Sequence, residues 1–157
     1  MAGKSESGRK IVCRNKRARF DYRISDVFEA GLVLTGTEVK SLRDGRANLT
    51  DAYARVIDGE VWMYNSHIDP YTHAHHGNHN PERTRKLLLH KREIKKLYGQ
   101  TQERGKSLIP LSIYFKRGKA KVELGLAQGK QAYDKRQAIK QRMADREMAR
   151  VHRRQWD

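Results

Sequence analysis

Two apolar rows face each other across a tight turn in the last third of the chain, and this pattern restricts the fold more than any other feature. The turn falls at Arg117-Gly118. Counting outward from it, we expect the apolar pairs Ile109 with Leu126, Leu111 with Leu124, Ile113 with Val122 and Phe115 with Ala120. The polar pairs, Ser112 with Glu123 and Tyr114 with Lys121, fall on the outward face. A slip of one residue would expose the apolar rows, so the register of this hairpin is firmly specified.

A second hairpin turns at Asp58-Gly59, a two-residue turn whose twist matches that of paired strands. The expected pairs are Tyr53 with Tyr64, Ala54 with Met63, Arg55 with Trp62, Val56 with Val61 and Ile57 with Glu60. The core face is then made by Ala54, Val56, Val61 and Met63. The outward face presents Tyr53, Arg55, Trp62 and Tyr64. This hairpin is therefore apolar on one side and both aromatic and basic on the other.

The remaining segments complete a recognisable order. Residues 22–34 predict a long strand with a bend at Gly31, and Thr35 with Glu38 forms a capping box that predicts a short helix. After Pro81, residues 82–104 are predicted to form a helix, with an inward face made by Leu87, Ile94, Leu97 and Tyr98. A bent strand, a short helix, a hairpin, a helix and a second hairpin are the plan of a five-stranded antiparallel OB-fold barrel, so we expect a mainly β protein with helices. An α+β sandwich of similar content is the alternative.

Charge divides the chain into three parts. Residues 1–19 carry seven basic and one acidic side chain and residues 128–157 carry nine and four, so these 49 residues hold +11 of the net +16. We expect a flexible basic arm over residues 1–19, an RNA-binding barrel over 20–128 and a basic tail over 129–157. The tail has only a thin apolar stripe, so we expect it to be disordered when free and helical when bound. A tail helix docked on the barrel is the alternative.

Two basic arms on a moderately basic domain are typical of a protein that binds a polyanion, most often a nucleic acid. A cationic protein that is merely soluble is the other interpretation. RNA recognition combines cations for phosphates with flat groups for unpaired bases. Tyr114 beside Lys121 offers both, and a basic cluster is formed by Arg83, Arg85, Lys86, Lys91, Arg92, Lys95 and Lys96.

Other classes of function are disfavoured. A single cysteine, Cys13, excludes internal disulfides and favours a reducing, cytoplasmic setting. No apolar run is long enough to span a membrane, and no secretory signal follows the N-terminus. The loop containing His73, His75, His76 and His79 suggests zinc, but nothing orients these rings, so we expect a solvated loop with no metal. No catalytic motif is present, so we expect neither an enzyme nor a cofactor.

Six stretches of the sequence resemble the SmpB family, the SsrA-binding proteins of bacteria, in order and spacing over about residues 14–145. They are Asn15 to Arg19, Glu29-Ala-Gly, Leu34 to Arg43, Arg83 to Glu93, Pro110 to Lys116 and Tyr133-Asp-Lys-Arg136. The resemblance implies a bacterial cytoplasmic OB-fold protein that binds the tRNA-like domain of transfer-messenger RNA (tmRNA). It also implies delivery of this RNA to stalled ribosomes for trans-translation, which rescues the ribosome and tags the nascent peptide. The protein would act as a monomer without membrane or cofactor and would catalyse no reaction.

The resemblance also implies roles for individual residues. The positions that match RNA-binding residues of the family are Glu29, Lys86, Leu88, His90 and Lys121. The tail would occupy the decoding centre and the empty mRNA channel of the small ribosomal subunit through Gly129, Lys130, Tyr133, Asp134, Lys135 and Arg136. Gln131 stands where the family tends to have a lysine. A general OB-fold protein that binds single-stranded RNA or associates with ribosomes is the alternative.

Overall fold

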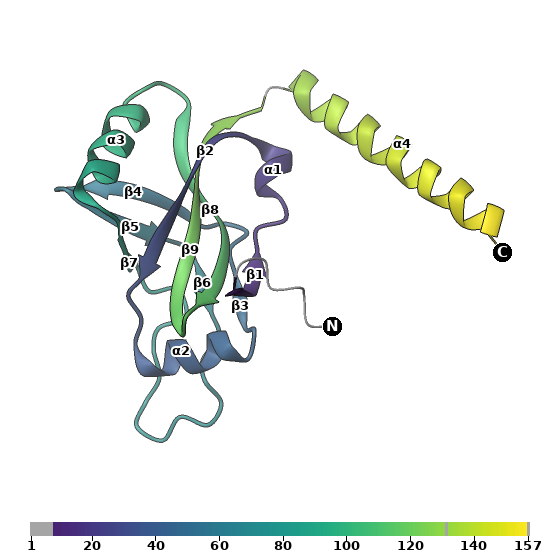
Figure 1. The fold of residues 1–157 in the computed structure, drawn as a ribbon. Helices are drawn as coiled ribbons and strands as arrows, with labels where there is room; N and C mark the ends of the chain where they lie inside the picture. Colours follow the sequence, from purple (N-terminus) through teal and green to yellow (C-terminus); the bar gives the residue numbers. More distant parts are fainter. Residues whose placement is uncertain (1–7, 131, 157) are drawn as a thin grey trace.

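The computed structural model describes residues 8–130 and 132–156, with the backbone alone for residues 132–134 and 156 (Figure 1). Its elements in chain order are β1 (Arg9–Arg14), α1 (Ala18–Asp21), β2 (Tyr22–Leu32), α2 (Gly36–Arg43), β3 (Ala47–Asn48), β4 (Tyr53–Ile57), β5 (Glu60–Tyr64), β6 (His67–Ile68), β7 (Arg85–Leu88), α3 (Lys91–Thr101), β8 (Lys106–Lys116), β9 (Lys119–Gly129) and α4 (Ala132–Trp156).

The strands close into an antiparallel ring. Its order is β8-β4-β5-β7-β2-β9, and β9 pairs back onto β8. The strand β1 pairs with residues 112–116 of β8, beyond Leu108, where β4 pairs with the same strand. The core inside this ring is made mainly by the apolar faces of the two hairpins, and Leu42 of α2 and Leu97 of α3 join it. The helices α2 and α3 lie at different ends of the barrel (Figure 1). The predicted fold class, mainly β with an antiparallel barrel, is confirmed.

The first predicted hairpin is β4–β5, and all five predicted pairs are confirmed. Asp58 and Gly59 have φ values of 51° and 75°. Positive φ at both turn residues is what a two-residue turn needs to match the twist of the strands. Ala54, Val61 and Met63 are buried, as expected for the core face.

The second hairpin, β8–β9, follows the prediction near its turn and departs from it farther away. Ile113 pairs with Val122 and Phe115 with Ala120, as expected. A bulge between Pro110 and Ser112 then shifts the register, so that Leu108 rather than Ile109 pairs with Leu126. The predicted pairs Ile109–Leu126 and Leu111–Leu124 are therefore wrong.

The physical reason for the shift is a second, smaller apolar cluster beside the main core. The bulge turns Ile109 and Leu111 into this cluster, where they join Ala18 and Ala127. Asn15 stabilises the irregular backbone there. Its backbone N–H donates to the carbonyl of Leu111 at 2.7 Å, and its side-chain amide donates to the carbonyl of Pro110 at 3.1 Å.

Residues 82–104 form a strand followed by a helix, not the single predicted helix. In β7, Arg85 and Leu87 point inward while Leu88 is exposed, and the strand lies between β5 and β2. The helix α3 begins only after His90, where Glu93 accepts the backbone N–H of His90 at 3.2 Å. The described ring thus has one strand more than the five-stranded barrel that the sequence predicts.

Strand pairing begins before residue 20. Within the segment expected to be a flexible arm, β1 pairs with β8 from Arg9 onward, because Val12 and Cys13 pack against the core. The expected flexibility of residues 1–7 concerns residues outside the described part of the chain.

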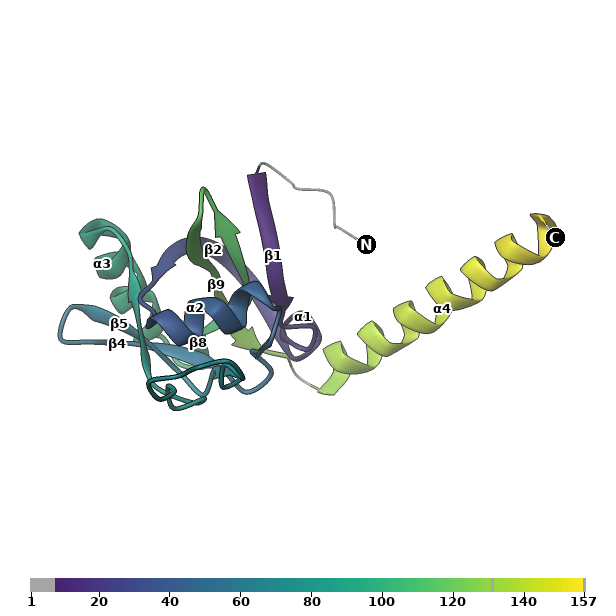
Figure 2. The ribbon, with the colours of Figure 1, turned by 90° about the horizontal axis from the view of Figure 1, so that it is seen from below.

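The helix α4 projects away from the barrel (Figures 1 and 2). It adjoins α1, where Lys135 pairs with Asp21 at 3.7 Å and the Arg142 guanidinium lies 5.0 Å from the centroid of the Phe20 ring. No described residue of α4 belongs to either apolar cluster. Disorder of the tail in solution stays a prediction. None of the described helices combines the length and apolarity needed to cross a membrane.

Candidate RNA interface

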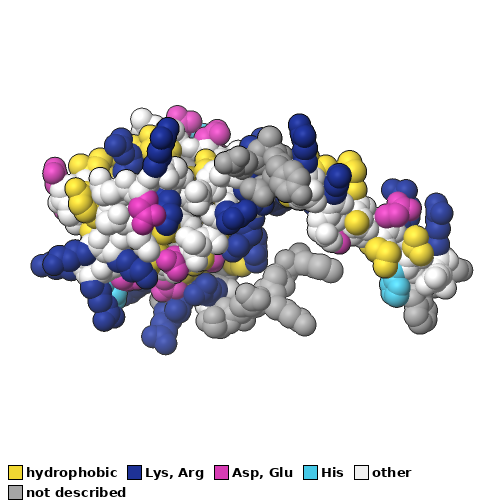
Figure 3. Space-filling model, turned by 90° about the horizontal axis from the view of Figure 1, so that it is seen from above, with side chains coloured by type: hydrophobic (Ala, Val, Ile, Leu, Met, Phe, Trp, Pro, Cys, Tyr) yellow, Lys and Arg dark blue, Asp and Glu magenta, His cyan; other side chains and the backbone are white. Residues whose placement is uncertain are grey.

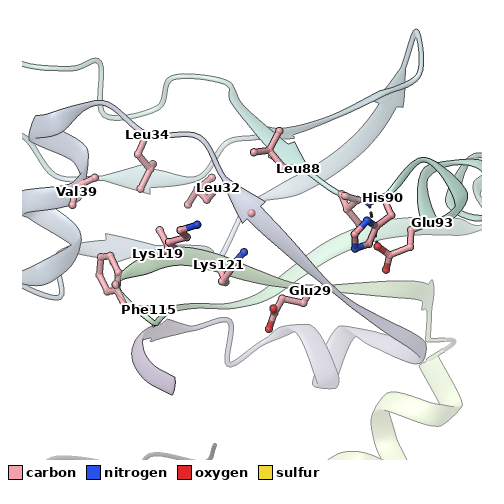
Figure 4. Close-up of a pocket in the computed structure, with 14 residues that line it drawn as sticks. Glu29, Leu32, Leu34, Val39, Leu88, His90, Glu93, Phe115, Lys119 and Lys121 are labelled. Carbon is pink, nitrogen blue, oxygen red and sulfur yellow. Dashed lines mark hydrogen bonds between the residues drawn. The ribbon is translucent and has the colours of Figure 1, made fainter. Parts of the chain in front are cut away.

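A groove of about 620 Å³ opens on the outer surface where β2, the end of β7, the β8–β9 hairpin and the start of α3 meet (Figure 4). Its apolar lining consists of Leu32, Leu34, Val39, Leu88, Leu89, Phe115 and Ala120. Its charged and polar lining consists of Glu29, His90, Glu93, Lys119 and Lys121. Four of the five predicted RNA-binding positions, Glu29, Leu88, His90 and Lys121, therefore lie together.

A row of three residues paired across β7, β2 and β9 sets the shape of this groove. Gly31 of β2 pairs with Leu88 of β7 on one side and with Lys121 of β9 on the other. A Cβ atom on Gly31 would lie 3.3 Å from the Cβ of Leu88, closer than most side chains tolerate. The glycine therefore leaves room for Leu88, which is 54% exposed although it is large and apolar. A leucine exposed beside a lysine suits a ligand with both flat apolar and anionic parts.

Glu29 is held by a network on the outer face. It accepts a hydrogen bond from the Tyr114 hydroxyl at 2.5 Å and forms ion pairs with Arg9 at 3.3 Å and Lys116 at 3.5 Å. The hydrogen bond from Tyr114, with help from the two cations, lowers the pKa of Glu29 below its usual value. The carboxylate is thus ionised and already has three partners.

The expectation that Tyr114 is exposed is wrong. Its side chain lies on the outward face as predicted, but the residue is only 1% exposed. Arg9, carried by β1, covers it with the guanidinium 4.5 Å from the ring centroid. Burial, together with the hydrogen bond to Glu29, raises the pKa of Tyr114. The ring is therefore not available to stack on a base, and its role is to hold Glu29.

Lys86 and His90 occupy two different settings. Lys86 lies outside the groove lining, on the outer face of β7, and its ammonium contacts Glu60 at 3.0 Å. Both partners are partly exposed, so the pair can exchange with solvent or a phosphate. His90 lines the groove and is also the N-cap residue of α3.

Arg85 does not belong to the solvated basic cluster in which the sequence places it. It is fully buried, donates to Glu38, and also donates to the Ser66 carbonyl at 2.8 Å and the Pro81 carbonyl at 3.0 Å. Arg83 donates to the other oxygen of Glu38 at 2.6 Å. Burial by itself raises the pKa of Glu38, but the hydrogen bonds it accepts outweigh burial and lower the pKa to about 2. Arg85 therefore ties β7 to α2 and cannot reach a phosphate.

The histidine loop is more ordered at one end than expected. His79 lies 2.8 Å from the Thr37 hydroxyl and 2.9 Å from the Ile68 carbonyl, so both nitrogens of its ring are engaged within the protein. Across residues 8–130 and 132–156, no three histidine, cysteine or acidic side chains converge in a way that could hold a metal ion.

The predicted tail residues lie apart from the groove. Gly129 ends β9, and Lys130 donates its backbone N–H to the Asp21 carbonyl at 3.0 Å and its ammonium to the Arg19 carbonyl at 2.8 Å. Lys135 and Arg136 follow in α4. The backbones of Tyr133 and Asp134 lie in the same helix, while their side chains, and Gln131 altogether, fall outside what the structure describes.

Lysine and arginine side chains are spread over the barrel face seen in Figure 3 and continue along α4, where hydrophobic side chains lie between them. The protein thus presents cations on two bodies, the barrel and the projecting helix.

The family model described as SmpB protein matches residues 12–154. An SsrA-binding protein of Acidothermus cellulolyticus is 62% identical over 146 residues, which cover 93% of this chain and 92% of the relative. One of Syntrophobacter fumaroxidans is 61% identical, covering 92% and 90%. A solved structure described as "tmRNA-SmpB: a journey to the center of the bacterial ribosome" superposes with a TM-score of 0.67 and 49% identity, covering 81% of this chain and 93% of that one. The fold, the groove and these matches together show that the chain belongs to the SmpB family of SsrA-binding proteins.

Proposed function

We propose that this protein binds transfer-messenger RNA at its tRNA-like domain and delivers it to stalled ribosomes for trans-translation. The observation that carries the proposal is the row of Leu88, Gly31 and Lys121, which puts an exposed apolar side chain and a cation on either side of Gly31 in one groove. The relatives named SsrA-binding protein and the solved structure of a tmRNA–SmpB assembly support it.

Each of the five predicted RNA-binding residues has a role that follows from its setting. Lys121 neutralises a phosphate, and Leu88 packs against the apolar face of a sugar or base. His90 donates or accepts a hydrogen bond with the RNA at the edge of the groove. Lys86 exchanges Glu60 for phosphate. Glu29 acts chiefly by fixing Arg9 and Lys116, because its carboxylate is already held by these cations and by Tyr114.

The tail acts in a separate step. Residues 129–157 occupy the decoding centre and the empty mRNA channel, with Gly129 and Lys130 as the junction and Tyr133, Asp134, Lys135 and Arg136 at the centre. Their support is the match to the family motif and the projection of α4 away from the barrel (Figure 2). The tail is disordered in the free protein and helical on the ribosome. This is supported by the two contacts beside α1, Lys135 with Asp21 and Arg142 with Phe20, and by the lack of any described α4 residue in the two apolar clusters.

The protein acts as a monomer in the cytoplasm, where ribosomes are, and as an adaptor that makes and breaks no covalent bond. It needs no metal or cofactor, because binding and positioning are its whole contribution. The tagging sequence and the amino acid that is transferred reside on the RNA.

The test is a gel-shift comparison at two salt concentrations between the tRNA-like domain and an unrelated RNA of equal length. We expect a preference for the tRNA-like domain that persists at the higher salt, because contacts beyond simple charge neutralisation resist salt. Lys121→Gln is expected to weaken this binding more than Lys140→Gln, which removes the same charge from the exposed face of α4. Equal binding to both RNAs that collapses with salt would instead identify a general RNA-binding OB-fold protein.

A further inference from the structure

The outer face of the β4–β5 hairpin carries aromatic rings. Tyr53 and Tyr64 are directly paired across the two strands. Their rings are stacked, with centroids 5.3 Å apart and planes 16° apart. Tyr53 is 37% exposed, so one edge of this stack is open to solvent. Such a pair stabilises a hairpin, and it is also a ready-made platform on which a further flat group can stack.

A second row lies next to the tyrosines on the same face. Arg55 of β4 pairs with Trp62 of β5, and Trp62 pairs with Lys86 of β7. The three side chains therefore stand side by side across three strands, with the indole between two cations. Within the described part of the chain, neither the Arg55 nor the Trp62 side chain takes part in a hydrogen bond, an ion pair or a ring contact. The hydroxyls of Tyr53 and Tyr64 likewise make no hydrogen bond there.

This face is continuous with the groove. Lys86 and Leu88 alternate with the inward residues Arg85 and Leu87 of β7, so both lie on the outer surface. Leu88 lines the groove, and Lys86 stands beside Trp62. An RNA held at Leu88 and Lys121 therefore needs to cross only one strand, β7, to reach the indole.

We propose that the outer face of β4–β5 binds an unpaired segment of the same RNA, with Trp62 and the Tyr53–Tyr64 pair stacking on its bases and Arg55 and Lys86 contacting its phosphates. This extends the proposed RNA-binding function from the groove onto a neighbouring surface and rests on that function. Tyr53 is exposed, and Trp62 and Tyr64 are partly exposed. Unpaired RNA is the ligand that matches solvent-accessible aromatic rings interleaved with cations, since a duplex keeps its bases stacked inside.

Trp62 and Arg55 are the residues to test, because the tyrosine pair also supports the hairpin itself. In a Trp156→Phe background, Trp62 is the single tryptophan of the chain. Its fluorescence is measured while the full-length protein is titrated with the tRNA-like domain of tmRNA and, separately, with a fully paired RNA duplex of similar length. We expect quenching with the first RNA and none with the duplex.

Affinity is measured in parallel for Trp62→Leu and Arg55→Gln. Loss of one stacked base weakens binding by about fivefold to about a hundredfold, so Trp62→Leu is expected in that range. Arg104→Gln is the matched control for charge, because Arg104 is exposed and belongs neither to the groove lining nor to the aromatic face. This variant is expected to bind like the parent. Thermal unfolding of each variant verifies that the barrel is intact.

Quenching together with the selective loss in Trp62→Leu and Arg55→Gln supports the inference. If the parent binds the tRNA-like domain tightly while Trp62 fluorescence stays unchanged and both variants keep full affinity, the inference is wrong and the proposed function stands. A parent that shows no preference for the tRNA-like domain contradicts the proposed function itself. Quenching of Trp62 by ribosomes that carry no transfer-messenger RNA, but not by the tRNA-like domain, also overturns the inference, because the face would then serve another partner.

Discussion

Leu88 shows how one absent side chain shapes the groove. Because a Cβ atom on Gly31 would come within 3.3 Å of the Cβ of Leu88, Gly31→Ala has to push Leu88 aside. We expect the fold to survive with a loss of about 1 kcal/mol in the free energy of unfolding, typical of modest overpacking. Affinity for the tRNA-like domain is expected to fall clearly in a gel shift. Gly36→Ala is the control, since no atom lies within 4 Å of its added Cβ. If the two variants bind with equal affinity, Leu88 takes no part in RNA binding.

Tyr114 and Glu29 lead to a prediction about pH. Tyr114→Phe keeps the ring under Arg9 but removes the hydroxyl that chiefly lowers the pKa of Glu29. We expect the carboxyl pKa to rise towards its usual value, as measured by NMR titration. At neutral pH the variant is expected to lose about 1 kcal/mol of unfolding free energy, reduced from the usual strength of a bond to a charged group because Glu29 is partly exposed.

The sign of this pH dependence follows from the direction of the shift. A carboxyl group whose pKa is lowered on folding stabilises the protein above its unfolded pKa, and that stabilisation is lost as the pH falls through the folded pKa. The difference between the parent and Tyr114→Phe should therefore be full at neutral pH and shrink in acid. A difference that stays constant down to strong acid would contradict the role given to Glu29.

At the residue scale, the sequence predicts which face a side chain lies on better than what covers it. Alternation correctly places Tyr114 on the outward face of β8. It carries no sign that β1 adds to that strand and that Arg9 lies over the ring. The prediction for Arg85 is wrong for a related reason, because an arginine in a basic stretch gives no indication of a buried partner. Glu38, 47 residues away in the chain, is the group that makes its burial possible.

At the scale of elements, turn chemistry decided which predictions hold. The Asp58-Gly59 turn determines the whole register of β4–β5, and every pair follows. In β8–β9 the turn determines only the nearest pairs, because the bulge between Pro110 and Ser112 depends on a neighbouring cluster that alternation does not reveal. The sequence does not predict the strand β7, because the apolar run Leu87-Leu88-Leu89 fits a helix as well as a strand. The capping pair of His90 and Glu93 marks the boundary between β7 and α3.

The contact between α2 and β7 gives the strongest stability prediction. Glu38→Gln removes the charge that compensates the buried Arg85 and the adjacent Arg83. Breaking a buried ion pair by removing one partner costs about 3–5 kcal/mol, so we expect a large fall in the free energy of unfolding at neutral pH. Because the folded pKa of Glu38 is lowered to about 2, its contribution is present above the ordinary carboxyl range and is lost as the pH approaches 2.

Chemical denaturation at neutral pH and near pH 2 checks this prediction, since the parent and Glu38→Gln should converge in acid. Glu82→Gln is the control, because the Glu82 side chain is 70% exposed and forms a long ion pair with His67, at 3.8 Å. A neutral-pH loss no greater than that of Glu82→Gln would show that the two arginines find other partners.

At the scale of the whole molecule, the barrel and α4 are joined by a small junction. Both apolar clusters are built without α4, while Lys130 bonds to the carbonyls of Arg19 and Asp21 and so belongs to the barrel side. Each of the two parts carries its own cations, on the barrel surface and along α4 (Figure 3). Two separable tasks, holding an RNA and reaching a distant site, fit this arrangement.

Truncation after Lys130 tests that division directly. The shortened protein keeps its core and the Lys130 contacts and loses the Lys135–Asp21 pair and the Arg142–Phe20 contact. We expect nearly unchanged thermal stability. Affinity for the tRNA-like domain should stay within about threefold at moderate salt, because the lost tail charges contribute only the general, salt-sensitive attraction to phosphate. Ribosome rescue, measured as tagging of a peptide on a message without a stop codon, should be abolished.

A chain with its tail sequence shuffled, equal in length and charge, is the control. It should bind the RNA and fail in rescue as the truncated protein does. If the truncated protein instead loses most of its RNA affinity while the shuffled chain keeps it, the tail belongs to the RNA-binding surface and the two tasks are not separate.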